Sequence, residues 1–263
     1  MDPEFAPELP VARTFGAKRA ALILGASVFV QFLVGFVVGM VVGIYHGYQN
    51  AAHHLHLDAH EISVRVQKDI LLPIGVLSII LGAWVVYQMV RRDFPGSIRD
   101  GAFEALGGVR SSTRDIFVSA LVGVALTLTT LFIVIPLFPP DSHSYMGPMS
   151  AATGASPVGR YFWIFIAVLL APPSEEFLFR GVLYAGFSRS WGSLRAAICV
   201  SVIFVSLHLF EVIGYLPALF GISGLAIGTM IVRQRTGSLI APMAMHIAYN
   251  LTLAIIVFGF AAK

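Results

Sequence analysis

Long apolar runs separated by short polar segments recur along almost the whole chain. Most are close to the roughly 20 residues that a helix needs to cross the hydrocarbon core of a bilayer. The pattern therefore predicts an all-α, polytopic membrane protein with about seven spans, and an eighth short or re-entrant segment would also fit. We place the spans at residues 20–45, 70–90, 116–138, 161–187, 194–210, 216–232 and 238–260.

The predicted spans divide the chain into four segments. Residues 1–19 form a cytoplasmic tail, and residues 20–138 form an N-terminal transmembrane region of three spans. Residues 139–160 are rich in Pro, Gly and Ser, which is typical of a loop, and residues 161–263 form a C-terminal transmembrane core. The opening residues MDPEF fit an expression remnant and a natural start equally well, and they are set aside. We expect the spans to pack as one helical bundle around a buried polar cavity.

The composition indicates a membrane protein with little soluble mass. Hydrophobic residues make up 57% of the 263 positions and charged residues 12%, whereas about a quarter of an ordinary soluble domain is charged. The single cysteine, Cys199, allows no intramolecular disulfide and no thiolate metal cluster. Basic residues flank the apolar runs instead of forming an aromatic-interleaved patch. We therefore expect the lipid bilayer, and no nucleic acid, as a partner.

The basic residues also predict an orientation. If the seven spans alternate, Arg13, Lys18, Arg19, Arg91, Arg92, Arg99, Arg110, Arg114, Arg189, Arg195, Arg233 and Arg235 fall on one side, and Arg65, Lys68, Arg160 and Lys263 fall on the other. The positive-inside rule then places the N-terminus in the cytoplasm and the C-terminus outside. Fourteen arginines against three lysines favour a GC-rich genome, and hence a bacterial plasma membrane.

Two repeated patterns have structural interpretations. The segment 46–69 contains His46, His53, His54, His56 and His60. Their spacing fits no defined metal-ligand motif, so we interpret the segment as a solvated loop. Glycines recur every fourth residue at positions 35, 39 and 43, and again at 224 and 228. This spacing lets helix backbones approach closely, and we expect packing within the chain in preference to dimerisation. The sequence assigns no oligomeric state.

A small set of strongly polar side chains lies inside the predicted spans, where charged groups are costly and usually functional. Glu176 and Arg180 are four residues apart, so they share a helix face and can form a salt bridge. Glu175 points about 100° away, where its own helix offers no counter-charge, and must find partners on other helices. The set comprises Glu175, Glu176, Arg180, His208, His246 and Asn250.

Two prolines stand directly before the glutamates. Pro172 and Pro173 interrupt a helical hydrogen-bond ladder, and Ser174 is a suitable N-cap. We therefore expect the helix to break and restart, with both glutamates in the first turn of a half-helix. The free amides and the positive dipole end there favour carboxylates. Glu175 would stay ionised but poorly neutralised, as befits a general base.

The other polar residues reach a similar depth in the membrane. At 1.5 Å per residue from the cytoplasmic ends of the spans, Glu175, His208 and Asn250 lie about 18 to 20 Å deep, and His246 about 12 Å deep. Together these groups could orient and deprotonate a water and stabilise an oxyanion. No serine or cysteine stands at a helical spacing from the histidines, which favours direct attack by water. The alternative is that the histidines only satisfy buried glutamates.

Three short motifs occur in order along the C-terminal core. EEFLFR, FVSLH and HIAYN resemble the motifs EExxxR, FxxxH and HxxxN/D of the CAAX-protease and bacteriocin-processing family, also called Abi, which are type II CAAX endopeptidase-like intramembrane proteases. The resemblance covers about residues 160–260. It implies that Glu175 is a base that holds a water with His208. It also implies that His246 and Asn250 form an oxyanion site, with support from Glu176, Arg180 and Phe204.

The resemblance implies an intramembrane endopeptidase acting on a membrane-associated or lipid-modified peptide or protein. Family members differ in substrate, and a bacterial source argues against a prenylated one. We expect no cofactor, although Glu175, His208 and His246 could instead bind Zn²⁺ with an open position. One alternative is a non-catalytic self-immunity, scaffold or regulatory protein. Another is a proton-coupled transporter, which predicts an internal repeat that the two halves do not show.

Overall fold

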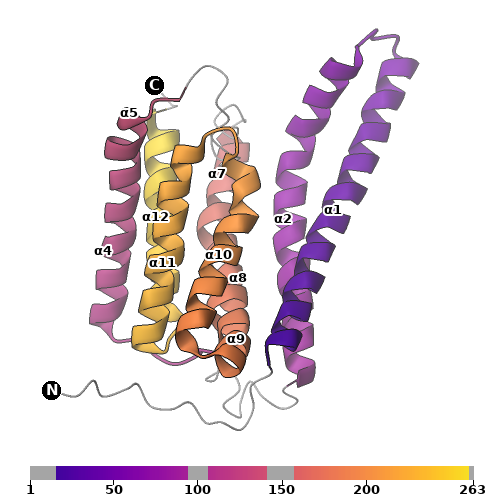
Figure 1. Ribbon diagram of the computed structural model, residues 1–263. Helices are drawn as coiled ribbons and strands as arrows, with labels where there is room; N and C mark the ends of the chain where they lie inside the picture. Colours follow the sequence, from indigo (N-terminus) through magenta and orange to yellow (C-terminus); the bar gives the residue numbers. More distant parts are fainter. Residues whose placement is uncertain (1–15, 94–105, 141–156, 261–263) are drawn as a thin grey trace, which may run out of the picture. The chain divides into compact units, whose positions relative to one another are not determined.

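The computed structural model describes residues 16–93, 106–140 and 157–260, and within these ranges it contains helices and turns but no strand (Figure 1). This confirms the predicted all-α fold. Most of the predicted tail and most of the predicted loop 139–160 lie outside the described residues. The same is true of Arg13, Arg99 and Lys263, which entered the predicted charge distribution.

The helices follow the predicted spans, and several extend beyond them. The N-terminal pair is α1 (Ala17–Ala52) and α2 (Ala59–Asp93). Next comes α4 (Thr113–Thr129), which continues through the π-helical segment η2 (Thr130–Val134) into α5 (Ile135–Leu137). The rest of the chain contains α7 (Pro157–Phe165), the π-helical η4 (Ile166–Leu170), α8 (Ala171–Glu176), the π-helical η5 (Phe177–Leu183), α9 (Tyr184–Trp191), α10 (Ser193–Val212), the short 3₁₀ turn η6 (Leu216–Ala218), α11 (Leu219–Thr236) and α12 (Ile240–Phe260).

Six helical stretches among the described residues are long and apolar enough to cross a membrane, which indicates an integral membrane protein. Protein covers only 17% to 39% of their most apolar windows, so much of the apolar surface requires lipid. The predicted fifth span corresponds to a shorter apolar helix, Ser193–Leu209, within α10. The six stretches are Ala17–Ala52, Pro73–Asp93, Thr113–Leu137, Gly159–Trp191, Leu216–Thr236 and Ile240–Gly259.

Ile23–Met89 forms one compact unit, a hairpin of α1 and α2. The predicted solvated loop 46–69 is mostly helical instead, because α1 continues to Ala52 and α2 already begins at Ala59. Asn50 closes the turn between them through two hydrogen bonds with the backbone of Leu57. His46 pairs with Asp69 across the hairpin, with 2.8 Å between Nε2 and Oδ2. Polar residues therefore extend both helices where a loop was expected.

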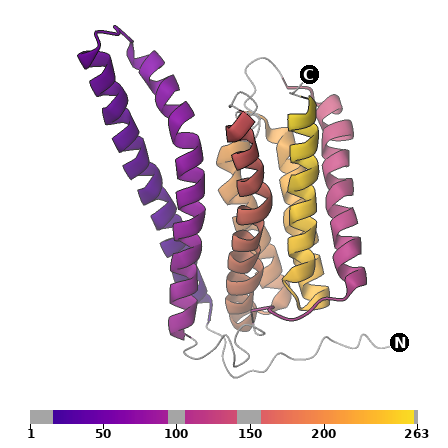
Figure 2. The same cartoon turned by 180° about the vertical axis from the view of Figure 1, so that it is seen from behind.

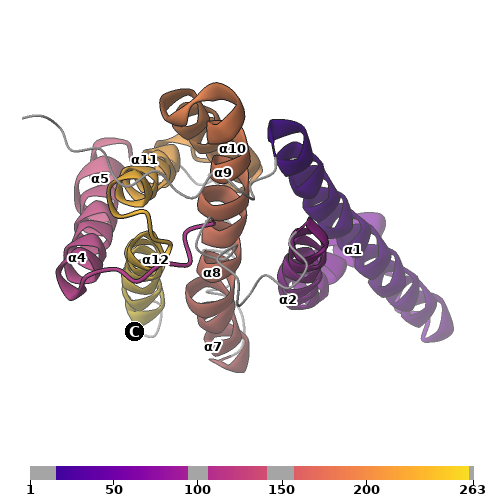
Figure 3. The ribbon, with the colours of Figure 1, turned by 90° about the horizontal axis from the view of Figure 1, so that it is seen from below.

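The other unit contains the described residues before Ile23 and after Met89. Its successive passes, formed by α4, α7 to α9, α10, α11 and α12, run in alternating directions (Figures 1 and 2). Seen along the helix axes, α12 lies between α4 and α11 on one side and α7 and α8 on the other (Figure 3), and it contacts all four. Helix α12 is therefore the central helix of this unit.

Helices α4 and α12 approach each other closely in this unit. The buried residues of α4 are small and spaced every four positions: Ser119, Gly123 and Thr127. A Cβ atom added at Gly123 would lie 2.2 Å from the backbone oxygen of Met245. The Thr127 hydroxyl donates a hydrogen bond of 2.9 Å to the carbonyl of Tyr249. Small side chains thus let the two backbones meet directly.

The two glycine repeats singled out in the sequence behave differently. Added Cβ atoms at Gly224 and Gly228 would lie 2.7 Å from Leu126 Cδ1 and 3.0 Å from Met245 Sδ, so this pair supports packing within the chain as predicted. Added Cβ atoms at Gly35, Gly39 and Gly43 would meet no atom within 4 Å. Within the unit Ile23–Met89, these three glycines therefore do not form a close contact with α2.

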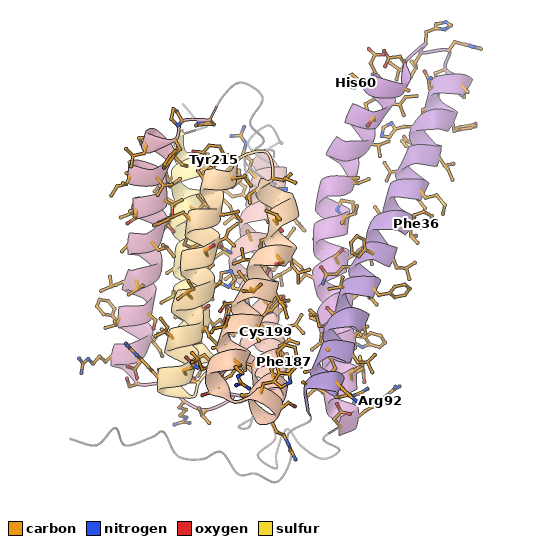
Figure 4. All side chains as sticks on the ribbon, viewed as in Figure 1. Phe36, His60, Arg92, Phe187, Cys199 and Tyr215 are labelled. Atoms are coloured by element: carbon orange, nitrogen blue, oxygen red, sulfur yellow. The ribbon has the colours of Figure 1, made fainter. Side chains whose placement is uncertain are left out.

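The alternating passes gather basic residues at one end of this unit. Arg110 and Arg114 lie where α4 begins, Arg189 and Arg195 flank the junction of α9 and α10, and Arg235 lies at the end of α11. Phe187, labelled in Figure 4, lies near this end, and Tyr215 lies at the opposite end. The orientation of these ends relative to a membrane stays a prediction.

We expect Gly123→Ala to lower the free energy of unfolding by about 1 to 3 kcal/mol, because the new methyl group overpacks a contact made by backbone. Gly259→Ala on α12 is the matched control, since its added Cβ meets nothing within 4 Å. Thermal unfolding of both variants in the same detergent measures the difference. Indistinguishable melting temperatures for the two variants would contradict the packing of α4 on α12.

Candidate active site

Glu175 and Glu176 lie within one continuous helical pass that runs from α7 to α9. The predicted break and restart is wrong. Ser174 does not cap a new helix, because its hydroxyl donates to the Ala171 carbonyl at 2.8 Å. The π-helical η4 precedes the prolines, and its wider turn lets the helix pass through positions that lack N–H groups. The glutamates are therefore inside a helix and not at a free N-terminus.

Glu176 and Arg180 form the predicted salt bridge. Glu176 Oε1 lies 3.2 Å from Arg180 Nη1, and both side chains are fully buried. Arg180 Nη2 also donates to the carbonyl of Ala226 on α11 at 3.1 Å. Removing either partner would leave an uncompensated charge in the interior. The pair therefore ties the glutamate-bearing helix to α11.

Phe204 lies one turn before His208 on α10, and its aromatic ring contacts two of the polar side chains of the site. Its ring stacks on the His208 imidazole with 4.3 Å between centroids, and the guanidinium of Arg180 lies over the ring at 4.5 Å from its centroid. A cation over an aromatic face is worth roughly 2 kcal/mol when desolvated. Phe204 is 1% exposed. It therefore separates the buried cation from the imidazole and holds the orientation of both.

His246 on α12 makes a contact with Glu176 that the spacing of residues along one helix could not reveal. Its Nδ1 lies 2.8 Å from Glu176 Oε1, the oxygen that also accepts from Arg180. An ionised carboxylate only accepts hydrogen bonds, so Nδ1 carries the proton. Glu176 thus links a cation on its own helix to an imidazole on another.

The tautomer of His208 follows from its backbone contact. Its Nδ1 lies 2.8 Å from the carbonyl oxygen of Phe204, and since a carbonyl can only accept, Nδ1 is the donor. Nε2 is then the ring nitrogen that faces the neighbouring helices. Both candidate histidines therefore commit Nδ1 to a structural partner and leave Nε2 for chemistry.

Glu175 lies between the two imidazoles. Its Oε2 is 3.8 Å from His208 Nε2 and 3.9 Å from His246 Nε2. These distances exceed those of direct hydrogen bonds. The side chains of Glu175 and His208 are 26% and 19% exposed, whereas that of His246 is 4% exposed. The prediction that Glu175 finds its partners on other helices is thus confirmed, and accessibility falls from Glu175 toward His246.

Asn250 makes a structural hydrogen bond outside the group formed by Glu175, His208 and His246. Its Nδ2 donates a hydrogen bond of 2.7 Å to the carbonyl of Ala167 in η4. The N–H of Ala171 bonds to Ile166 in this π-helical turn, so the Ala167 carbonyl would next pair with residue 172, a proline that has no N–H. The Asn250 amide supplies the missing donor. Its second Nδ2 hydrogen is not used by this bond.

Arg233 was assigned from the sequence to the basic flank of a span, but it is 3% exposed. Its Nε donates to the carbonyl of Arg180 at 3.0 Å. The guanidinium lies directly against Gly107, where an added Cβ would be 2.8 Å from Arg233 Cζ. Arg233 therefore supports the backbone of the residue that pairs with Glu176, and nothing in its position at a span end indicated this.

The predicted polar cavity is not shown. A cavity of about 280 Å³ among the described residues has an apolar lining that includes Pro173, Phe177 and Met243. Pro173 and Phe177 lie roughly opposite Glu175 around their helix. The described residues also contain no group of three or more His, Cys, Asp or Glu side chains arranged to hold a metal ion. The alternative zinc site at Glu175, His208 and His246 stays a prediction.

Residues 157–252 match the family described as type II CAAX prenyl endopeptidase Rce1-like. The chain carries an Rce1-like domain. The seven candidate residues all fall inside it, which confirms the family resemblance read from the three motifs. Neither the curated proteins nor the solved structures contain a match to the chain. Membership in this family implies that the domain is an intramembrane protease with a protein substrate.

We expect Glu176→Gln to lower the free energy of unfolding of the chain by about 3 to 5 kcal/mol, because it leaves Arg180 buried without a counter-charge. Adding Arg180→Met should recover part of this loss, since the stranded cation is then removed. Thermal unfolding in detergent compares the single and double variants with the wild type. A Glu176→Gln protein that melts with the wild type would show that the ion pair does not stabilise the Rce1-like domain.

Proposed function

We propose that the chain is an intramembrane endopeptidase in which a glutamate-activated water hydrolyses a peptide bond of a membrane-associated or lipid-modified substrate. The observation that carries this proposal is the position of Glu175. Its Oε2 lies within 4 Å of the Nε2 atoms of both His208 and His246, while each histidine has its Nδ1 bound elsewhere. A carboxylate facing two oriented imidazoles suits proton transfer.

In the proposed first step, Glu175 and His208 hold a water molecule. Glu175 removes a proton as the water oxygen attacks the carbonyl carbon of the scissile bond. The partial exposure of both side chains supports access of water to this point. When the C–N bond breaks, protonated Glu175 returns the proton to the leaving amine. These reaction steps need no covalent intermediate between enzyme and substrate, and none of them uses a metal ion.

The same attack places negative charge on the carbonyl oxygen. His246 can stabilise that oxyanion by donating from Nε2 when its ring is protonated on both nitrogens. The contact of Nδ1 with Glu176 orients the ring so that Nε2 faces Glu175. Glu176 would therefore act as a positioning residue for His246. Asn250 would contribute the Nδ2 hydrogen that its bond to Ala167 leaves over.

We expect Glu175→Gln to abolish peptide cleavage while the protein still folds, because the variant removes the base without stranding a buried partner. The assay uses the full chain in detergent with a library of palmitoylated, internally quenched peptides. The melting temperature of the variant should stay close to that of the wild type. Cleavage at the wild-type rate by Glu175→Gln would overturn the mechanism, and a non-catalytic immunity or scaffold role would predict no Glu175-dependent cleavage at all.

We expect Asn250→Ala to lower turnover by about a hundredfold or more with little change in KM, as the loss of an oxyanion donor does. Asn250→Gln, which keeps the amide but displaces it, tests whether position matters as well as chemistry.

Dialysis against a chelator should leave wild-type activity intact, with zinc well below one per chain by elemental analysis. Stoichiometric zinc with chelator-sensitive, zinc-restorable activity would instead make His246 a metal ligand.

A further inference from the structure

Glu211 is a further carboxylate close to the candidate site, and it belongs to none of the three motifs. It follows His208 by three residues on α10, so both lie on the same helix face, with Glu211 about 4.5 Å further along the axis. Helix α10 ends at Val212, so Glu211 belongs to its last turn. Glu211 thus lies one turn beyond the imidazole, next to the C-terminal end of α10.

The charge of Glu211 acts on the candidate site. Desolvation by the surrounding protein raises the pKa of Glu211 above its ordinary value, the charge of His208 lowers this pKa, and the charge of Glu175 raises it. The residue as a whole is nevertheless exposed among the described residues. Glu211 therefore combines accessibility with electrostatic contact to two of the proposed catalytic groups.

A structural role does not account for this placement. His208 already has its orienting partner, because its Nδ1 donates to the Phe204 carbonyl. The buried cation Arg180 is compensated by Glu176 and has Phe204 between it and His208. The described residues also hold no carboxylate and imidazole group fit for a metal ion. The contacts that orient His208 and compensate Arg180 are therefore made without Glu211.

We propose that Glu211 is a specificity-determining residue that selects a lysine or arginine side chain next to the scissile bond and disfavours an acidic side chain or a free carboxylate there. This inference rests on the proposed peptidase function. An extended peptide advances about 3.3 Å per residue. A side chain one or two positions from a bond held over Glu175 would therefore reach the neighbourhood of Glu211, one helical turn from His208.

The test measures kcat/KM at pH 8 and low ionic strength on palmitoylated, internally quenched peptides that carry Lys, Gln or Glu at each position in turn. We expect the wild type to prefer Lys over Glu by about fivefold at one position beside the cleaved bond, the upper range for an exposed charge pair. Glu211→Gln should remove this preference, and Glu211→Lys should invert it. High salt should weaken the wild-type preference, because the pair is accessible to screening ions.

Glu61→Gln is the matched control, because Glu61 is an exposed carboxylate in the other compact unit and its replacement should leave the Lys to Glu ratio unchanged. Size-exclusion profiles and melting temperatures verify that the Glu211 variants are folded. Cleavage that depends on Glu175 but keeps one Lys to Glu ratio in all Glu211 variants would overturn this inference alone. The absence of any Glu175-dependent cleavage would overturn the proposed function together with it.

Discussion

One carboxylate oxygen, Glu176 Oε1, holds the candidate site together. It accepts from Arg180 on its own helix and from His246 on α12, and all three side chains are almost completely buried. Glu176 Oε2 and Arg180 Nε have no hydrogen-bond partner within the described part of the chain. A buried pair with such unsatisfied atoms adds little net stability over an apolar core. Its value lies in fixing the helix of Glu175 relative to α12.

The irregular helix around the two prolines depends on the same central helix. Prolines inside a membrane helix leave carbonyl groups without donors, and neighbouring helices must satisfy them. Asn250 does this for Ala167, one turn along α12 from the histidine that contacts Glu176. His246 and Asn250 of α12 therefore bind the helical pass that carries the glutamates at two points, one on each side of Pro172. Positioning and chemistry in this site use the same residues.

Local sequence patterns predicted those features that depend on one helix at a time. The all-α membrane fold, the Glu176–Arg180 pair and the family motifs all follow from apolar run length or from spacings of four residues. The contacts of Glu176 with His246, of Asn250 with Ala167 and of Arg233 with Arg180 join residues from different passes. Spacing along the chain carries no information about such pairs.

The predicted helix break failed for a different physical reason. Proline removes a donor from an α-helix, but the sequence does not show whether the chain responds by breaking or by widening one turn into a π-helix. Here the turn widens, and Ser174 bonds back to Ala171 instead of starting a helix. Glu175 consequently depends on side chains from α10 and α12 for its electrostatic environment and receives no help from a free helix end.

The contact between α4 and α12 bears on where the family domain can be cut from the chain. Residues 157–252 contain all the candidate residues, yet the backbone of Met245 rests on Gly123, which precedes that segment. Removing α4 would expose the face of α12 around Met245 and Tyr249 and deprive the Tyr249 carbonyl of Thr127. A fragment limited to residues 157–252 would therefore lack the contacts of α12 with α4, and also the hydrogen bonds that Gly107 and Val109 accept from Leu239 and Ser238.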